Sequence, residues 1–128
     1  MMTRKIFAVS LLLALTGIFA HAQGEAKTVK VRGYLIDNMC AGAPDDDKDY
    51  GADAKEHSVG CAAMPHCAKS GYAVAEGHKL YKLDEAGNTL AAKAFKTTKV
   101  TRGLMVEVEG TVEGTTLHAT KLVEVAAK

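Results

Sequence analysis

Apolar and polar residues alternate in three stretches of the chain, residues 28–36, 78–84 and 103–109, and this period of two is typical of half-buried β-strands. The predicted strands span residues 28–36, 72–76, 78–84, 103–113 and 116–125. Glycine lies inside two of them, at Gly33 and Gly110, where a strand readily bends or bulges. The pattern therefore predicts a mainly β protein.

Helices and one long loop are predicted between these strands. Residues 41–60 contain Gly, Pro and Asp throughout and show no periodicity, so we predict a loop there. Residues 58–70 favour a short helix, which Pro65 either shortens or breaks into two separate turns. Residues 90–96 are rich in helix formers and predict about two helical turns, whereas residues 85–88 have the composition of a turn.

This order of elements predicts a small five-stranded OB-like barrel with one or two short helices. The bends at Gly33 and Gly110 are how such a barrel turns its corners. In that arrangement residues 39–71 form an enlarged, cysteine-containing first connection, which in OB folds lies at the ligand-binding mouth. An open antiparallel α+β sheet is the alternative that the same pattern allows.

The start of the chain has the features of a secretory signal peptide. Residues 1–22 comprise a basic beginning, a short apolar run and an Ala-x-Ala end, which predicts cleavage after Ala22. The apolar run is too short to span a bilayer comfortably. We therefore expect a periplasmic or secreted protein, with a flexible lead-in at residues 23–27 and one OB-like domain at residues 28–128.

Charge and composition restrict the expected partners. The chain has 16 basic and 15 acidic residues, and loss of Arg4 and Lys5 with the signal peptide leaves a net charge of −1. The chain also has no tryptophan and few other aromatic residues. This balance predicts neither a nucleic-acid partner nor, after signal cleavage, a membrane partner. The expected partner is an exported ligand or protein that the sequence does not identify.

All three cysteines lie in the segment 39–71, at Cys40, Cys61 and Cys67. An odd number of cysteines in an exported protein favours one disulfide and one remaining thiol. A bridge from Cys40 to either Cys61 or Cys67 would close the acidic loop between them and restrict the unfolded chain.

A metal site is the alternative use of the same residues. His57 and Cys61 are spaced i, i+4, and Cys40 and Cys67 would complete a Cys3His tetrahedron suited to zinc or copper. Three further soft or borderline donors lie nearby and favour copper. They are Met39, Met64 and His66.

The acidic loop resembles a calcium-binding loop in its spacing. Counted from its first acid, it matches positions 1, 3, 5, 9 and 12 of an EF-hand. The matching residues are Asp45, Asp47, Asp49, Asp53 and Glu56. However, Tyr50 stands where an EF-hand requires glycine, and no helix is predicted before the loop. The alternative is a solvated acidic loop that has lysines as neighbours.

Several runs in the chain together resemble a group of small exported bacterial proteins of uncharacterised function. The runs are GYLIDNMC, SGYAV, KLYKLD and VEVEGTV, with His57-x-x-x-Cys61 and Cys67 between the first two. The resemblance covers nearly the whole chain after the signal peptide. It implies an OB-like fold and export, and it implies no activity. The spacing from Cys61 to Cys67 is wider than is typical of that group.

The sequence favours a binding or structural protein over an enzyme. It has no recognisable Ser-His-Asp arrangement, phosphate-binding glycine loop or pair of catalytic carboxylates. It also lacks the C-x-x-C of thiol oxidoreductases and the C-x-x-C-H of covalent haem. We expect a small exported domain whose cysteine-rich connection is held by a disulfide or holds a metal ion. The rival hypothesis is a periplasmic zinc, copper or thiol-redox protein.

Overall fold

The computed structural model describes residues 26–127. The predicted signal peptide, residues 1–22, lies outside the described residues. Five strands and five short helices follow one another along the described chain: β1 (Thr28–Asp37), α1 (Asn38–Ala41), α2 (Tyr50–Glu56), α3 (Val59–Ala62), α4 (Pro65–Lys69), β2 (Tyr72–Glu76), β3 (Lys79–Leu83), α5 (Glu85–Thr97), β4 (Met105–Glu113) and β5 (Thr116–Glu124). Within this part of the chain, no helix is long and apolar enough to cross a bilayer.

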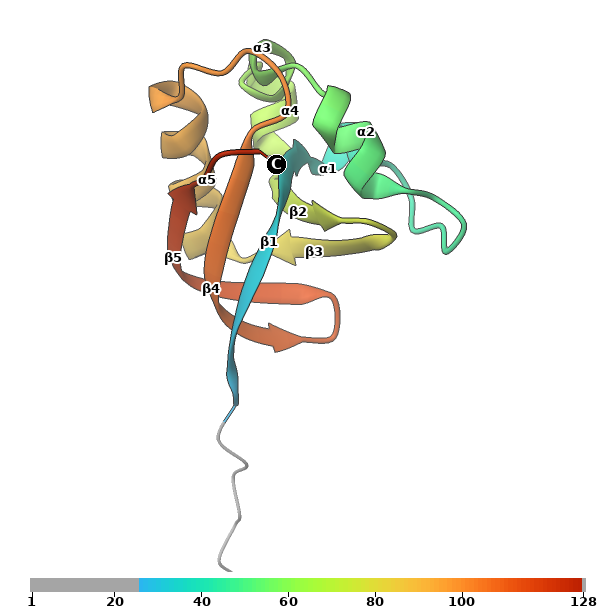
Figure 1. Cartoon of the computed structure of the whole chain (residues 1–128), viewed down its shortest axis with the longest axis vertical. Helices are drawn as coiled ribbons and strands as arrows, with labels where there is room; N and C mark the ends of the chain where they lie inside the picture. Colours follow the sequence, from blue (N-terminus) through green and yellow to red (C-terminus); the bar gives the residue numbers. More distant parts are fainter. Residues whose placement is uncertain (1–25, 128) are drawn as a thin grey trace, which may run out of the picture.

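The five strands form one sheet that closes on itself (Figure 1). They pair in the order β1-β2-β3-β5-β4, and β4 pairs again with β1. The pairs are antiparallel except for β3 with β5, which run parallel. β1 joins both ends of the ring, because residues 28–34 pair with β4 and residues 34–37 pair with β2. The predicted mainly β, five-stranded architecture is confirmed.

Both predicted strand bends lie where two strands approach closely. A Cβ atom at Gly33 would collide with the backbone carbonyl oxygen of Ala75 on β2. One at Gly110 would collide with the carbonyl oxygen of His118 on β5, and the pairing of β4 with β5 shifts register at this point. Only glycine leaves room for the neighbouring backbone at such positions.

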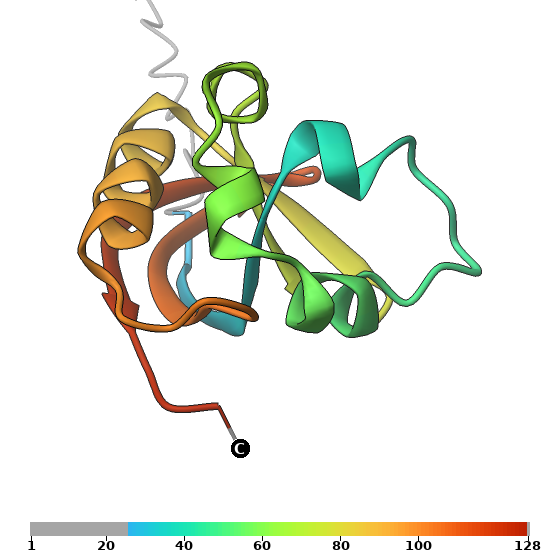
Figure 2. The ribbon, with the colours of Figure 1, turned by 90° about the horizontal axis from the view of Figure 1, so that it is seen from above.

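The main hydrophobic core is built from apolar residues of the strands and α5. Val106 and Val108 on β4 are fully buried, whereas Glu107 and Glu109 between them are half-buried, as the period of two predicts. Phe95 of α5 is also buried in this core, and its ring centroid lies 5.0 Å from that of Tyr72. Figure 2 shows α5 on one side of the sheet and α1 and α2 on the other.

A second, smaller core lies under α1 and α2. Apolar residues of β1 and β2 pack there against Ala41 of α1 and against Tyr50 and Ala54 of α2. The prediction of a loop throughout residues 41–60 is therefore wrong for residues 50–56. Asp49 caps α2 by accepting a hydrogen bond from the backbone of the first turn. Burial of one face of α2 against the sheet stabilises the helix further, and this burial cannot be read from the local sequence pattern.

The other two helix predictions are refined. The segment 58–70 forms two helices, α3 and α4, that are separated at Met64, so the interpretation as one broken turn followed by another is confirmed. The predicted turn at residues 85–88 is wrong, because these residues are the first turn of α5. Asp84 nucleates that turn as its N-cap, and Asp is a preferred residue at this position.

Asp84 also joins α5 to the sheet. Its Oδ1 accepts hydrogen bonds from the backbone N–H groups of Gly87 at 2.9 Å and Ala119 at 3.2 Å, and its Oδ2 lies 3.4 Å from Nδ1 of His118. Burial by itself would raise the pKa of Asp84, but the two backbone hydrogen bonds and His118 outweigh it and lower the pKa below its ordinary value.

We predict that Asp84→Ala lowers the free energy of unfolding by about 1–2 kcal/mol, the usual loss for an N-cap. Asp84→Asn is the matched control, because it retains an acceptor oxygen and cannot ionise. Since the folded pKa is depressed, the charge stabilises the protein above the unfolded pKa of about 3.9 and ceases to do so as pH falls through the folded value. The advantage of wild type over Asp84→Asn in urea denaturation should therefore shrink below about pH 4. A constant difference between these two proteins from pH 7 to pH 2 would contradict the assignment.

Candidate functional site

The three cysteines converge beside the end of β1, where α1, α3 and α4 meet (Figure 1). Cys40 comes from α1, Cys61 from α3 and Cys67 from α4. Their Sγ atoms all lie within 4.8 Å of one another. Cys40 is exposed, Cys61 is half-buried and Cys67 is buried, and all three are free thiols. The group thus extends from the surface into the protein.

Hydrogen bonds between α1 and the end of α4 bring Cys40 towards Cys67. Asn38 donates from its backbone to the carbonyl oxygen of Gly71 at 2.9 Å and from its side chain to that of Ser70 at 2.9 Å. The backbone N–H of Met39 donates to the Ser70 hydroxyl at 3.1 Å. The start of α1 is therefore joined to the residues that follow α4.

The break between α3 and α4 brings Cys61 towards Cys67. Six positions along one continuous helix would turn these two side chains well apart. Ser58 caps α3, Met64 is extended, and Pro65 begins α4 in the first helical turn, where proline is tolerated. The proline that made a single helix unfavourable is thus what makes the cysteine group feasible.

A buried carboxylate lies beside the thiols. Asp37, the last residue of β1, has no exposed surface. Its Oδ1 accepts a hydrogen bond from the backbone N–H of Cys40 at 2.9 Å, and its Oδ2 lies 2.9 Å from Nε2 of His57. Donor atoms of Asp37, Cys40 and His57 lie within 4.8 Å of one another and form a second group that shares Cys40 with the first.

The predicted Cys3His set is thereby divided. Cys40 belongs to both groups, whereas His57 belongs only to the group that contains Asp37. Asp37 was not among the predicted ligands. The signal that points to it is the spacing Asp37-x-x-Cys40. An Asp at the N-cap of a helix accepts a hydrogen bond from the backbone of the residue two or three positions later, so Asp37 is placed to cap α1 and to face Cys40.

The backbone of His57 is held by the segment before β4. The carbonyl oxygen of His57 accepts a hydrogen bond from Gly103 at 3.0 Å, and Val59 donates to the carbonyl oxygen of Thr101 at 3.0 Å. Gly103 has a φ of 63°, and a Cβ atom there would collide with the carbonyl oxygen of Lys55. Glycine is required at this position for both reasons.

Burial and the negative charge of Asp37 disfavour the ionised form of the thiols of Cys40 and Cys67. Cys40 is exposed as a residue, but its sulfur faces Asp37 and the other sulfurs. The pKa of Cys40 is raised to about 12 by desolvation, by the charge of Asp37 and by hydrogen bonds to Asp37 and Cys61. Burial, followed by the charges of Asp37 and Cys61, also raises the pKa of Cys67. Burial and then Asp37 and Cys67 raise the pKa of Tyr72. Such a region would be stabilised by a bound cation.

The structure does not bring the predicted calcium ligands together. These are Asp45, Asp47, Asp49, Asp53 and Glu56. In residues 26–127, only the two groups described above place three or more donor atoms within 4.8 Å of one another. Asp49 caps α2, Asp45 accepts a hydrogen bond from the backbone of Asp47 at 3.0 Å, and Asp53 pairs with Lys48 at 3.3 Å. These contacts are those of a solvated loop and a helix start.

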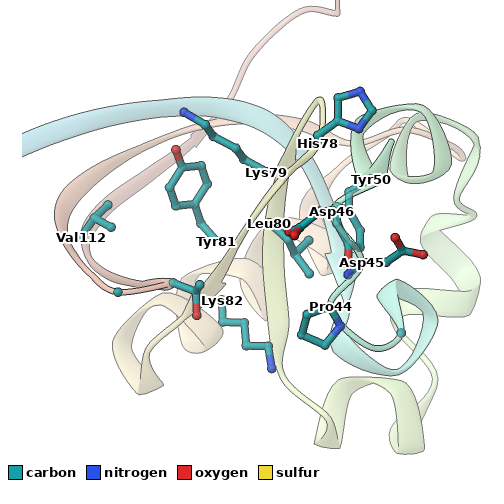
Figure 3. A pocket seen from close by; sticks show the side chains of 13 residues that line it. Pro44, Asp45, Asp46, Tyr50, His78, Lys79, Leu80, Tyr81, Lys82 and Val112 are labelled. Atoms are coloured by element: carbon teal, nitrogen blue, oxygen red, sulfur yellow. Dashed lines mark hydrogen bonds between the residues drawn. The ribbon is translucent and has the colours of Figure 1, made fainter. Parts of the chain in front are cut away.

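A groove of about 490 Å³ lies beside β3, between the first connection and the turn from β4 to β5 (Figure 3). Asp45, Asp46 and Tyr50 line one side, and the residues of β3 line the other. Lys79 and Lys82 extend from β3 in different directions in this view. The groove contains none of the three cysteines.

No protein-family model, curated protein or solved structure matches this chain. The predicted kinship with small exported bacterial proteins therefore stays a prediction. The function must be inferred from the chain's own residues.

We predict that Gly103→Ala destabilises the protein more than Gly114→Ala does. Both glycines have a positive φ, 63° and 61°, but a Cβ at Gly114 meets no atom within 4 Å. Gly114→Ala should therefore lower the free energy of unfolding only by the backbone strain, about 1 kcal/mol. Gly103→Ala should cost about 1–3 kcal/mol more, because the backbone at Lys55 must move. Urea denaturation measures both values, and equal losses would show that Gly103 does not hold the segment that positions His57.

Proposed function

We propose that this chain is a small exported domain that binds one thiophilic metal ion, zinc or Cu(I), between Cys40, Cys61 and Cys67. The observation that carries the proposal is that three free thiols from three separate helices lie within 4.8 Å of one another. Thiolate is the preferred protein ligand of both ions.

The charge distribution supports a cation at this position. The buried carboxylate of Asp37 lies beside the thiols and raises the pKa of Cys40 and of Cys67 in addition to the effect of burial. A metal ion binds the deprotonated thiols, releases their protons and compensates the negative charge that otherwise disfavours the thiolates.

The same pKa argues against the thiol-redox alternative. Only the thiolate attacks a disulfide or an electrophile, and reactive cysteines have a pKa below the ordinary value of about 8.5. The pKa of Cys40, the exposed cysteine of the group, is about 12. Without a metal ion its thiol is therefore protonated at neutral pH and is a poor nucleophile.

A structural disulfide from Cys40 to Cys61 or Cys67 is the second candidate. The proximity of the sulfurs favours it, since a bridge requires them to approach to about 2.05 Å. However, a disulfide uses two sulfurs and gives no role to the third. A metal ion uses all three sulfurs.

The fold also supports an OB-like barrel for the domain. The strand order β1-β2-β3-β5-β4, the parallel pairing of β3 with β5 and the position of α5 between β3 and β4 are what we expect of that fold. The cysteine segment then lies in the first connection, where OB folds carry ligand-binding residues. Export remains a proposal that rests on residues 1–22.

We predict about one zinc or copper ion per chain in protein isolated from the periplasm under mild conditions, measured by elemental analysis. Cys40→Ser, Cys61→Ser and Cys67→Ser should each reduce the bound metal at least about ten-fold, because each removes one of three ligands. His78→Ala is the control, because His78 is exposed and bonds to the backbone of Lys48. It should retain the metal.

Intact-mass analysis and thiol titration of the same sample separate the two candidates. The metal hypothesis expects a chain beginning at Gln23 with three thiols after the metal is removed. A metal-free protein with a single titratable thiol would instead establish the disulfide. A mass that includes residues 1–22 would contradict signal-peptide cleavage.

A further inference from the structure

The arrangement of the donors distinguishes between the two candidate ions. Zinc in a structural protein site takes four protein ligands in a tetrahedron, and zinc in an open site with three protein ligands completes the tetrahedron with water. Cu(I) is a softer ion that is stable with three thiolates in a plane, and soft sulfur ligands select it. The number of donors that the fold brings together therefore bears on which ion is bound.

The fold brings together three sulfurs without a fourth donor. In residues 26–127, no histidine nitrogen or carboxylate oxygen lies within 4.8 Å of all three sulfurs of Cys40, Cys61 and Cys67. The two nearest candidates, His57 and Asp37, are grouped with Cys40 alone. Each also faces the other at 2.9 Å, so recruiting either one to the metal requires that this buried contact be broken.

The spacing of the sulfurs admits a trigonal site. Metal–sulfur bonds of about 2.3 Å place the three sulfurs of a planar site about 4.0 Å apart and those of a tetrahedral site about 3.8 Å apart. The sulfurs lie within 4.8 Å before any ion is bound. Both spacings lie within that limit, so the sulfurs can hold an ion without moving apart.

Two exposed thioethers next to the thiols fit the same ion. Met39 precedes Cys40 and is 55% exposed, and Met64 lies at the break between α3 and α4 and is 40% exposed. Exposed methionines contribute little to the core. A thioether is a soft ligand of the kind that binds Cu(I).

We propose that the site selects Cu(I) and holds it in a three-coordinate site formed by the thiolates of Cys40, Cys61 and Cys67. This inference rests on the proposed metal-binding function. Copper arrives already reduced, so no electron is transferred on binding, and the thiols release their protons to solvent as the Cu–S bonds form. Asp37 and His57 stay paired with each other and act as positioning residues, because Asp37 holds the backbone N–H of Cys40.

The test uses the reduced protein without oxygen and offers it Cu(I) as its bicinchoninate complex together with an equal concentration of Zn(II). We expect Cu(I) to occupy at least about nine-tenths of the sites. Because bicinchoninate competes for the copper and nothing competes for the zinc, this occupancy would correspond to a preference of more than about ten-fold. X-ray absorption at the copper edge should then show three sulfur neighbours and no nitrogen or oxygen neighbour. Cys61→Ser should lose at least about ten-fold in Cu(I) affinity and one sulfur neighbour.

The other outcomes separate this inference from the proposed function. Preferential binding of zinc with four neighbours, the fourth being nitrogen or oxygen, would overturn the selection of Cu(I) and support metal binding at these cysteines. Binding of neither ion to protein with three titratable thiols would overturn both. Copper that binds equally well to a Cys40→Ser, Cys61→Ser and Cys67→Ser triple variant would place the ion elsewhere and also overturn both.

Discussion

The buried carboxylate of Asp37 is the contact on which the cysteine segment depends. A carboxylate with no exposed surface is stable only when its oxygens are hydrogen-bonded or face a cation. One oxygen caps α1 at the backbone of Cys40, and the other faces the ring of His57. The side chain of Asp37 thereby joins the end of β1 to α1 and to His57. Its negative charge also lies beside the thiols.

The cysteine segment is part of the folded domain rather than an appended loop. Its helices α1 and α2 cover apolar residues of β1 and β2 in a core of their own. Backbone hydrogen bonds from Val59 and Gly103 connect the start of α3 to the segment before β4. Because three of its helices each carry one thiol, an ion bound there would contact every one of them, and binding and folding would stabilise each other.

The electrostatics of the site are the physical basis of the proposed cation binding. A buried carboxylate lies beside three thiols, and burial together with the charge of this carboxylate raises the pKa values of two of them, so that their neutral form is favoured when no cation is present. Arrangements that disfavour the ionised state in this way are characteristic of functional sites. The acidic loop shows the contrast, because its carboxylates are used in a helix cap, a backbone hydrogen bond and a lysine pair.

The sequence by itself determined the elements whose signals are local. The period of two marked β1, β3 and β4, and glycine marked the bends at Gly33 and Gly110. The residue types also showed that chemistry is concentrated between Cys40 and Cys67. Only the tertiary structure decided which side chains meet. It formed α2 by burying Tyr50 and Ala54 against the sheet, placed Asp37 beside the thiols and grouped His57 with that carboxylate rather than with Cys61. These outcomes depend on distances between segments far apart in the chain, and no local pattern of residues specifies such distances.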